Sequence, residues 1–501
     1  ASTGGGIVVN GYAEYLEIGN NRITGNAGAF GGGIRVGHPQ LITQQGNTDI
    51  YTDAENDFIR VHHNHIARNG GRGGAGGGLS LHTGADEYAV EQNWICGNFS
   101  SGSGAGIGHL GLSDNGMIED NTILFNESFA QAGPTSGGGI FIAGQTGLVP
   151  DNAGLLLSPG SGSVTVDSNV IRGNLAGAGD GGGIQLLSVN GEDVTGNANS
   201  WHSVDLVNNM INNNVAGLAG GGIAIQDAVL VSIRNNTVAH NESTATAALA
   251  FSPGTFNVSN ATPAGIVART HSIDFGIALG ETNVAESFSA PVISDSIIEH
   301  NRSFFWLNYD DTTTPAIETG LFPANCTTAP TGCDLTNVEG YTADLAVMDG
   351  PFTVADPVAV GTLDPQFSLL TNTVENRVLY IGINGNFTGD PGFVNGYFNG
   401  ALNNENINEF TTLSTAGAFD EGGNFIQVAY RPLSIIEPGT TLSGNPPIND
   451  PTLKGTLLDY HVTAASDAID AGDPTNTLGV DIDDDLRPQG AGFDIGADEA
   501  Q

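Results

Sequence analysis

The sequence has little positive charge: 13 lysines and arginines stand against 54 aspartates and glutamates, which gives a formal net charge of −41. Proteins that bind nucleic acid or anionic membrane surfaces depend on clustered Lys and Arg, because these side chains displace counterions from phosphate groups. We therefore do not expect nucleic acid as a partner of this chain.

Long apolar runs are also missing. Although 39% of the residues are hydrophobic, no stretch approaches the roughly 20 apolar residues that a helix needs to cross a bilayer. The sequence thus predicts no membrane span. It opens at Ala1 without a charged and then apolar leader, so we expect any targeting segment to have been removed or to lie outside this sequence.

Cysteine is scarce, with three in the chain. Cys326 and Cys333 are seven positions apart, and two interpretations stay open for them. They close a small disulfide loop, which would suit an oxidising compartment, or they are two reduced thiols. Cys96 lies far from both and is expected to be a small core residue.

Glycine and asparagine are abundant instead, and both occur in a repeat. One phrase of six residues reads Asn, any, Ile or Val, any, any, Asn. It occurs at Asn21 to Asn26, Asn64 to Asn69, Asn93 to Asn98, Asn121 to Asn126, Asn169 to Asn174, Asn209 to Asn214 and Asn236 to Asn241, with a degenerate copy at Ser296 to Asn301. The closing asparagines are 43, 29, 28, 48, 40, 27 and 60 residues apart. This spacing indicates a coil of 27 to 29 residues that insertions lengthen.

A second phrase, Gly-Gly-Gly-Ile or a close variant, follows within about a dozen residues of the first. Its copies lie at Gly4 to Ile7, Gly31 to Ile34, Gly76 to Leu79, Gly104 to Ile107, Gly137 to Ile140, Gly181 to Ile184 and Gly220 to Ile223. Short strands between asparagine and glycine turns, without a 3.6-residue period, predict β structure throughout. Insertions at 39–57, 144–162 and 187–200 either cover a groove or decorate a wall.

Aligning the copies on their first asparagine gives two columns of aliphatic residues. The column three positions before it reads Ile18, Val61, Val90, Ile118, Val166, Leu206, Ile233 and Ile293, and the column two positions after it reads Ile23, Ile66, Ile95, Ile123, Ile171, Ile211, Val238 and Ile298. Such columns are typical of side chains stacked inside parallel strands about 4.8 Å apart. We expect the asparagines to adopt left-handed turn geometry and to stack their amides from coil to coil. The glycines are expected to allow positive φ and close approach of the coils.

The two phrases resemble the GGAI and FxxN repeats of polymorphic outer-membrane proteins, and the chain resembles the pectin-lyase-like superfamily. The end of the chain, from Asp481 to Glu499, resembles the closing segment of many secreted bacterial β-helix proteins. The resemblance implies an all-β fold: a single-stranded, right-handed parallel β-helix with irregular loops and a C-terminal closing segment. Its expected parts are repeats in 1–305, irregular final coils and long loops of the same solenoid in 306–455, and an Asp-rich closing segment in 456–501. It implies no single activity, because this fold hosts lyases, hydrolases, adhesins and fibres.

A column of polar residues is predicted on the outer wall, two positions before the first asparagine. Glu91 and Glu119 are neighbours in it and should stack within about 5 Å. Three interpretations stay open. The pair could serve retaining glycoside hydrolysis, it could bind Ca²⁺ together with Asp120 and Asp167, or the column is a solvated acidic ridge.

Cationic groups that could assist such chemistry are few. A uronate lyase needs one cation to neutralise the substrate carboxylate and a basic Arg or Lys to abstract a proton. Arg68, Arg72 and Arg172 could serve, of which Arg68 and Arg172 lie in adjacent rather than identical columns, and no lyase-specific phrase surrounds them. His62, His63 and His65 form a further constellation, but their expected neighbours on adjacent coils do not complete a zinc or copper shell.

The tail offers the best candidate site for Ca²⁺. Asp481, Asp483 and Asp485 alternate as in calcium-binding loops, although the glycine and the twelfth-position Glu of an EF-hand are missing. The other interpretation is a tight acidic turn paired with Arg487.

These observations favour an extracellular or cell-surface β-helix protein with a structural or adhesive role, which binds polysaccharide or other surface proteins. The first alternative is a polysaccharide lyase or glycoside hydrolase that uses Glu91 and Glu119, with Arg68 or Arg172 contributing. The second is one module of a larger secreted assembly, because the repeats begin in mid-coil at Gly4.

Overall fold

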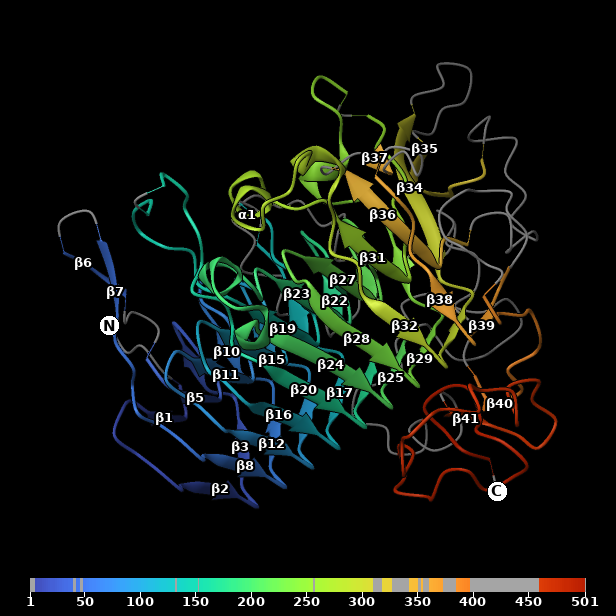
Figure 1. Ribbon diagram of the computed structural model, residues 1–501, viewed down its shortest axis with the longest axis horizontal. Coiled ribbons are helices and arrows are strands. Elements are labelled where there is room, and N and C mark those ends of the chain that lie inside the picture. Colours follow the sequence, from blue (N-terminus) through green and yellow to red (C-terminus); the bar gives the residue numbers. More distant parts are fainter. Residues whose placement is uncertain are drawn as a thin grey trace.

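Four short strands recur in each coil because two asparagine turns and one glycine turn interrupt the extended chain every few residues. The computed structural model describes residues 5–38, 42–45, 48–130, 133–151, 153–255, 257–309, 318–326, 342–349, 353–354, 360–372, 384–396 and 459–500. In a complete coil the chain passes through sheets A, B, C and D in turn and then re-enters sheet A beside the previous coil (Figure 1). The protein is thus a parallel β-helix.

The strands of the four sheets have the following bounds. Sheet A contains β1 (Ile7–Val9), β5 (Ile34–Val36), β11 (Leu79–His82), β15 (Ile107–Leu110), β19 (Ile140–Ala143), β23 (Ile184–Leu187), β27 (Ile223–Gln226), β31 (Ile266–Arg269), β36 (Leu345–Asp349) and the antiparallel β37 (Thr353–Val354). Sheet B contains β2 (Glu17–Gly19), β8 (Arg60–His62), β12 (Ala89–Glu91), β16 (Gly116–Glu119), β20 (Val164–Asp167), β24 (Ser203–Val207), β28 (Leu230–Arg234), β32 (Val292–Ser294) and β38 (Pro365–Gln366). Sheet C contains β3 (Arg22–Thr24), β9 (His65–Ala67), β13 (Trp94–Cys96), β17 (Thr122–Leu124), β21 (Val170–Arg172), β25 (Met210–Asn212), β29 (Thr237–Ala239), β33 (Ile297–Glu299) and β39 (Leu369–Leu370). Sheet D contains β4 (Ala27–Gly28), β10 (Gly70–Gly71), β14 (Phe99–Ser100), β18 (Glu127–Ser128), β22 (Leu175–Ala176), β26 (Val215–Ala216), β30 (Glu242–Ser243), β34 (Arg302–Tyr309) and the antiparallel β35 (Glu318–Pro323).

The remaining elements lie outside the four sheets. Two antiparallel pairs are formed by β6 (Ile42–Gln45) with β7 (Thr48–Tyr51) and by β40 (Phe393–Asn395) with β41 (Asp459–Val462). The short helix α1 spans Ile273–Ala278, and single 3-10 turns lie at Glu192–Thr195, Ala198–Ser200, Ala248–Ala250 and Val284–Glu286. In the described part of the chain, no helix has the length and apolar character needed to cross a membrane.

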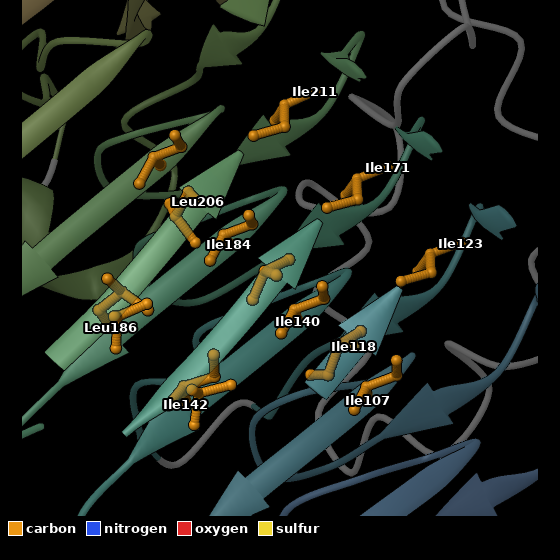
Figure 2. Packing of buried hydrophobic residues seen from close by; sticks show 14 of the residues in the cluster. Ile107, Ile118, Ile123, Ile140, Ile142, Ile171, Ile184, Leu186, Leu206 and Ile211 are labelled. Carbon is orange, nitrogen blue, oxygen red and sulfur yellow. The ribbon is translucent and has the colours of Figure 1, made fainter. Parts of the chain in front are cut away.

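Both predicted aliphatic columns are confirmed as the core. The strand register pairs Val90 with Ile118 in sheet B and Ile95 with Ile123 in sheet C, and every member of the two columns is at most 6% exposed. Figure 2 shows how isoleucines and leucines from successive coils stack along the interior. Since burial of one aliphatic side chain contributes about 1.5–3 kcal/mol, each added coil extends a continuous apolar interior that favours the fold.

The asparagines form two continuous amide ladders, as predicted. In each, the side-chain Nδ2 donates to Oδ1 of the asparagine one coil further on, at 2.9 to 3.1 Å. The predicted position of the left-handed backbone was wrong by one residue. The residue before each ladder asparagine adopts it, as in His63 (φ 52°) and Asp120 (φ 54°), because the asparagine itself must aim its amide along the stack.

The glycine phrase has the predicted conformational role. Its first glycine has a left-handed φ, 68° at Gly181. At the next position the coils approach so closely that a Cβ on Gly182 would lie 2.5 Å from the carbonyl oxygens of Gly221 and Val215. Backbone packs directly on backbone here, and this leaves no room for a side chain.

The closing segment, residues 459–500, lies along the outer face of sheet C beside the later coils (red in Figure 1). Tyr460 is fully buried and packs on Met210 and Ala239. Its hydroxyl donates to Oδ1 of Asn213 at 2.8 Å and lies 2.8 Å from Nδ1 of His240. The segment therefore contacts turn residues of the repeat itself.

The predicted region 306–455 lies mostly outside the described residues. Within it, β36, β38 and β39 continue sheets A, B and C in parallel register. Cys326 is disulfide-bonded, while its predicted partner Cys333 lies outside the described residues. Cys96 is buried on β13, as expected of a core residue.

Candidate functional site

Long loops between sheet A and sheet B line an open pocket of about 610 Å³. The loops follow β19, β23 and β31, and the second and third carry the turn at Glu192–Thr195 and helix α1. The insertions at 144–162 and 187–200 therefore contribute to a pocket. Its lining residues are Thr146, Leu156, Leu157, Ser158, Leu187, Ser188, Asn190, Gly191, Gln226, Asp227, Ser272, Ile273, Asp274 and Phe275.

Hydrogen bonds between the loops hold the pocket in shape. Oδ2 of Asp274 on α1 accepts from the backbone N–H of Leu156 at 3.0 Å. Oδ1 of Asp227, after β27, accepts from the N–H of Ser272 at 2.8 Å. Asn190 accepts from the N–H of Val229 at 2.9 Å. The four loops after β19, β23, β27 and β31 are thus tied to one another through side chains that line the pocket.

Several polar groups of the pocket are left without a hydrogen bond among the described residues. These are the side-chain amide of Gln226, Oδ2 of Asp227 and Oδ1 of Asp274. Leu156, Leu157, Ile273 and Phe275 supply apolar surface beside them. Convergent polar groups on an apolar wall are typical of a small-molecule or oligosaccharide subsite.

The outer column of carboxylates has the predicted register. Glu91 pairs with Glu119 on the next coil, and Glu119 pairs with Asp167. The sequence analysis missed the partner of Glu91: Arg60 Nε donates to Glu91 Oε1, and Arg60 also lies 3.6 Å from Glu17. Alternation along β8 places Arg60 and His62 on the same face, and this was the available signal.

Burial and neighbouring negative charges both raise the pKa values of Glu119, Asp120 and Asp167. Burial raises the pKa of Glu119, and the neighbouring carboxylates of Asp120 and Asp167 raise it further. Asp120 and Asp167 are affected in the same direction, again chiefly through burial, with Asp484 adding to the rise of each pKa. Asp484 belongs to the closing segment, so a fifth carboxylate reaches the row from a distant part of the chain.

Neither predicted arginine joins this row. Arg68 is exposed in the turn between β9 and β10, and no ion pair or side-chain hydrogen bond links it to the carboxylates within the described residues. Arg172 lies on β21, donates from Nε to Asn212 Oδ1 at 2.6 Å and sits 5.5 Å from the ring of Tyr460. Burial lowers the pKa of Arg172 to about 10. The columns of the two arginines are adjacent, as the alignment indicated.

His62, His63 and His65, in the second coil, are not arranged as ligands of one metal ion. His62 and His63 contact each other through Nδ1 at 3.0 Å. His65 lies in register between Arg22 and Trp94, as predicted. In the part of the chain that the structure describes, none of the three belongs to a group of ligand atoms close enough to share a metal ion.

The Asp-rich tail forms a tight turn. Oδ1 of Asp481 accepts from the N–H groups of Asp483 and Asp485 at 2.9 Å each, and Oδ2 accepts from the N–H of Glu499 at 2.9 Å. Arg487 pairs with Glu499 at 3.1 Å. Ca²⁺ binding by Asp481, Asp483 and Asp485 stays a prediction. In the structure, backbone N–H groups already donate to both carboxylate oxygens of Asp481.

Asp483 points instead to a histidine that the sequence analysis did not single out. His461 Nε2 lies 3.0 Å from Asp483 Oδ2, and its Nδ1 lies 2.6 Å from Asp459 Oδ1. The hydrogen bond with Asp483 raises the pKa of His461 to about 9, and that contact lowers the pKa of Asp483. No repeat or spacing in the sequence relates position 461 to position 483, so only the fold brings them together.

No protein-family model and no curated relative matches the sequence. The likeness to polymorphic outer-membrane proteins therefore stays a resemblance of repeated phrases. Among solved structures, the chain is similar to the catalytic unit of thermostable GH87 alpha-1,3-glucanase from Streptomyces thermodiastaticus strain HF3-3, with 14% identity and a TM-score of 0.16. The match covers 49% of this chain and 49% of that chain. A TM-score this low carries no argument about activity.

Proposed function

We propose that this protein is an extracellular or cell-surface β-helix that binds polysaccharide through the pocket between the loops after β19, β23 and β31, with an adhesive or structural role. The observation that carries the proposal is a set of polar groups beside apolar side chains: the side-chain amide of Gln226, Oδ2 of Asp227 and Oδ1 of Asp274, which have no hydrogen bond among the described residues. Sugars present hydroxyl groups and apolar C–H faces, and this combination matches both kinds of surface.

The negative charge of the pocket and of the whole chain limits which saccharides are expected to bind. Two of the three groups are carboxylates, and the chain carries a net charge of −41. A polyuronate would meet like charge in the pocket and in the field of the whole protein, because unscreened charges of one sign repel. The expected ligand is thus a neutral or amino-sugar polysaccharide, whose hydroxyl or ammonium groups donate to Asp227 and Asp274.

Calorimetric titration with neutral, amino-sugar and uronate oligosaccharides tests the proposal. We expect binding of one of the first two classes, and Gln226→Ala should weaken it about 3- to 10-fold, because one or two hydrogen bonds are lost. Asp274→Asn should weaken an amino sugar most, since the amide keeps the bond to the N–H of Leu156 but loses the charge. The exposed Glu14 gives a matched control, Glu14→Gln. Absence of binding by folded protein, or equal binding by Gln226→Ala, would refute the pocket as the site.

A second candidate is glycoside hydrolysis at the Glu91–Glu119 row. It is favoured by the direction of the pKa shift of Glu119, because a raised pKa favours the protonated form from which a general acid donates. A reducing-end assay on the same oligosaccharides distinguishes the two roles. Turnover that disappears in Glu119→Gln and persists in Gln226→Ala would favour hydrolysis at the row; silence across the panel, with binding retained, would favour adhesion.

A further inference from the structure

The closing segment gathers one histidine and three carboxylates from three places. Asp459 and His461 lie on β41, Asp483 lies in the Asp-rich turn, and Asp498 lies near the end of the chain. One ligand atom each of His461, Asp483 and Asp498 falls within 4.8 Å of the others. The three are 22 and 15 residues apart in the sequence, so the fold of the closing segment creates the cluster.

We propose that His461, Asp483 and Asp498 bind a divalent transition-metal ion, with Zn²⁺ as the best fit. One imidazole nitrogen and two carboxylate oxygens are ligands that Zn²⁺ takes at about 2.0 to 2.2 Å, which leaves a fourth position for water. Donor atoms around a tetrahedral ion are about 3.4 Å apart. The contact of 3.0 Å between His461 Nε2 and Asp483 Oδ2 is already near that separation.

The orientation of His461 supports a metal on Nε2. Oxygen of a carboxylate only accepts, so the contact of 2.6 Å with Asp459 Oδ1 places the imidazole proton on Nδ1. Without a bound ion, Nε2 donates its proton to Asp483 Oδ2. An ion bound between the two replaces that proton and takes the lone pair of Nε2. A carboxylate behind the ligating histidine fixes its tautomer and ring plane, as metal sites commonly require.

Asp498 gives a second, independent observation. It is only 8% exposed, and its Oδ2 accepts from the N–H of Val462 at 2.7 Å. Its other oxygen has no hydrogen bond among the described residues. A carboxylate in a side chain this buried is costly unless it is paired, and a cation shared with His461 and Asp483 would supply a partner for its second oxygen.

The nature of the ligands selects the ion. Ca²⁺ takes six to eight oxygen ligands and rarely a nitrogen, whereas imidazole suits Zn²⁺ and its neighbours in the first transition row. This site shares only Asp483 with the Ca²⁺ loop predicted at Asp481, Asp483 and Asp485, and it takes a different ion. The position of the site gives the bound ion a stabilising role. It would hold β41, which carries the buried Tyr460 and Val462 that pack the closing segment on sheet C.

Titration of the metal-free 501-residue chain with Zn²⁺, and separately with Ca²⁺, tests the site by calorimetry and by thermal unfolding. We expect one Zn²⁺ per chain and a rise of Tm by several degrees, because the ion binds the folded state. Asp498→Asn and His461→Gln should each weaken Zn²⁺ binding at least 10-fold. Asp498→Asn keeps an acceptor for the N–H of Val462, so it is the variant that best preserves the fold.

Asp484→Asn is the matched control, since it removes one carboxylate from the same turn without touching the three ligands. It should leave Zn²⁺ affinity within twofold. The proposal would be overturned if Zn²⁺ produced no heat and no change of Tm, if Ca²⁺ bound equally well, or if Asp498→Asn and Asp484→Asn lost affinity alike. In each of those cases His461 acts only as an ion-pair partner of Asp459 and Asp483. Oligosaccharide binding at the loop pocket is independent of this result.

Discussion

Asn121 and Asn169 are joined by two hydrogen bonds that converge on one atom. Oδ1 of Asn169 accepts from the backbone N–H of Asn121 at 2.9 Å and from its Nδ2 at 3.0 Å. The same Nδ2 donates to the carbonyl oxygens of Val90 and Glu119 at 2.7 and 2.8 Å. One side chain thus satisfies turn groups of three successive coils, and this explains why the phrase repeats.

Replacing Asn121 with alanine should destabilise the protein by about 2–4 kcal/mol, because buried carbonyl and N–H groups on both neighbouring coils lose their partners. Asn21 lies at the exposed start of the same ladder and offers a control, because its side chain makes one hydrogen bond to the following coil, from Nδ2 to Oδ1 of Asn64. Asn21→Ala should cost less than about 1 kcal/mol. Urea unfolding of the two variants measures the difference, and equal costs would contradict a ladder role that depends on burial.

Close approach of the coils should make Gly182 intolerant of any side chain. Gly182→Ala places a Cβ 2.5 Å from two carbonyl oxygens, so we expect a loss of about 1–3 kcal/mol. A Cβ added to Gly70 on β10 would have no atom within 4 Å beyond those of the glycine and its two chain neighbours. Gly70→Ala should change stability by less than about 1 kcal/mol, in the stabilising direction, because alanine restricts the unfolded chain. Thermal unfolding of both variants distinguishes them, and two equal losses would refute the packing argument.

The stability of the protein should depend on the volume of the side chains in the two interior columns. Ile171 is fully buried between Ile123 and Ile211, so Ile171→Ala should cost about 2–5 kcal/mol and Ile171→Val about 0.5–1.5 kcal/mol. Val292 points outward and is 64% exposed; Val292→Ala should change the free energy of unfolding by less than about 0.5 kcal/mol. A cost for Val292→Ala that matched the cost for Ile171→Ala would argue against this interior.

The periodic parts of the fold were predictable because each coil repeats the same physical solution. The column from Ile18 to Ile293 and the ladder from Asn26 to Asn301 depend only on residues at fixed offsets, so alignment of the sequence with itself reveals them. The outer row of Glu91 and Glu119 follows from the same register. The ladder also ends in a residue that the alignment did not include: Asn301 donates to Asp344 Oδ1 at 2.8 Å.

The non-periodic parts of the fold could not be predicted by aligning the sequence with itself. The pocket is built by loops that interrupt the repeat, and its contact between Asp274 and Leu156 joins positions 118 apart. The closing segment contacts turn residues up to 272 positions away, through Asn208 and Val480. Nothing in the local sequence encodes such pairs, because they depend on how a unique segment packs on a repeated surface. His461 was overlooked for that reason.

Buried His109 should make stability depend on pH. Its Nε2 faces the carbonyl oxygens of Ser161 and Gly111 at 2.8 and 3.0 Å, and Nδ1 lies 2.8 Å from the hydroxyl of Tyr88. Carbonyl oxygens only accept, so Nε2 carries the proton and Nδ1 accepts from Tyr88. The ring is therefore neutral in the fold, and burial lowers the pKa of His109 from 6.5 to about 4.

The sign of the effect follows from proton counting. Between pH 6.5 and pH 4 the unfolded chain binds a proton at His109 that the folded chain does not bind. The free energy of unfolding then falls as the pH falls, at up to about 1.4 kcal/mol per pH unit. Asp86, whose pKa burial raises to about 6, contributes in the opposite direction, so the effect of His109 is isolated only by comparison with a variant.

His109→Gln keeps a donor for the carbonyl oxygen of Ser161 but cannot be protonated. From pH 7.5 to pH 5 the wild type should lose about 2 kcal/mol more stability than the variant. Urea unfolding of both proteins at the two pH values provides the measurement. Parallel pH profiles would mean that the unfolded chain gains no extra proton at His109, and they would contradict a neutral imidazole enclosed by Tyr88 and Ser161.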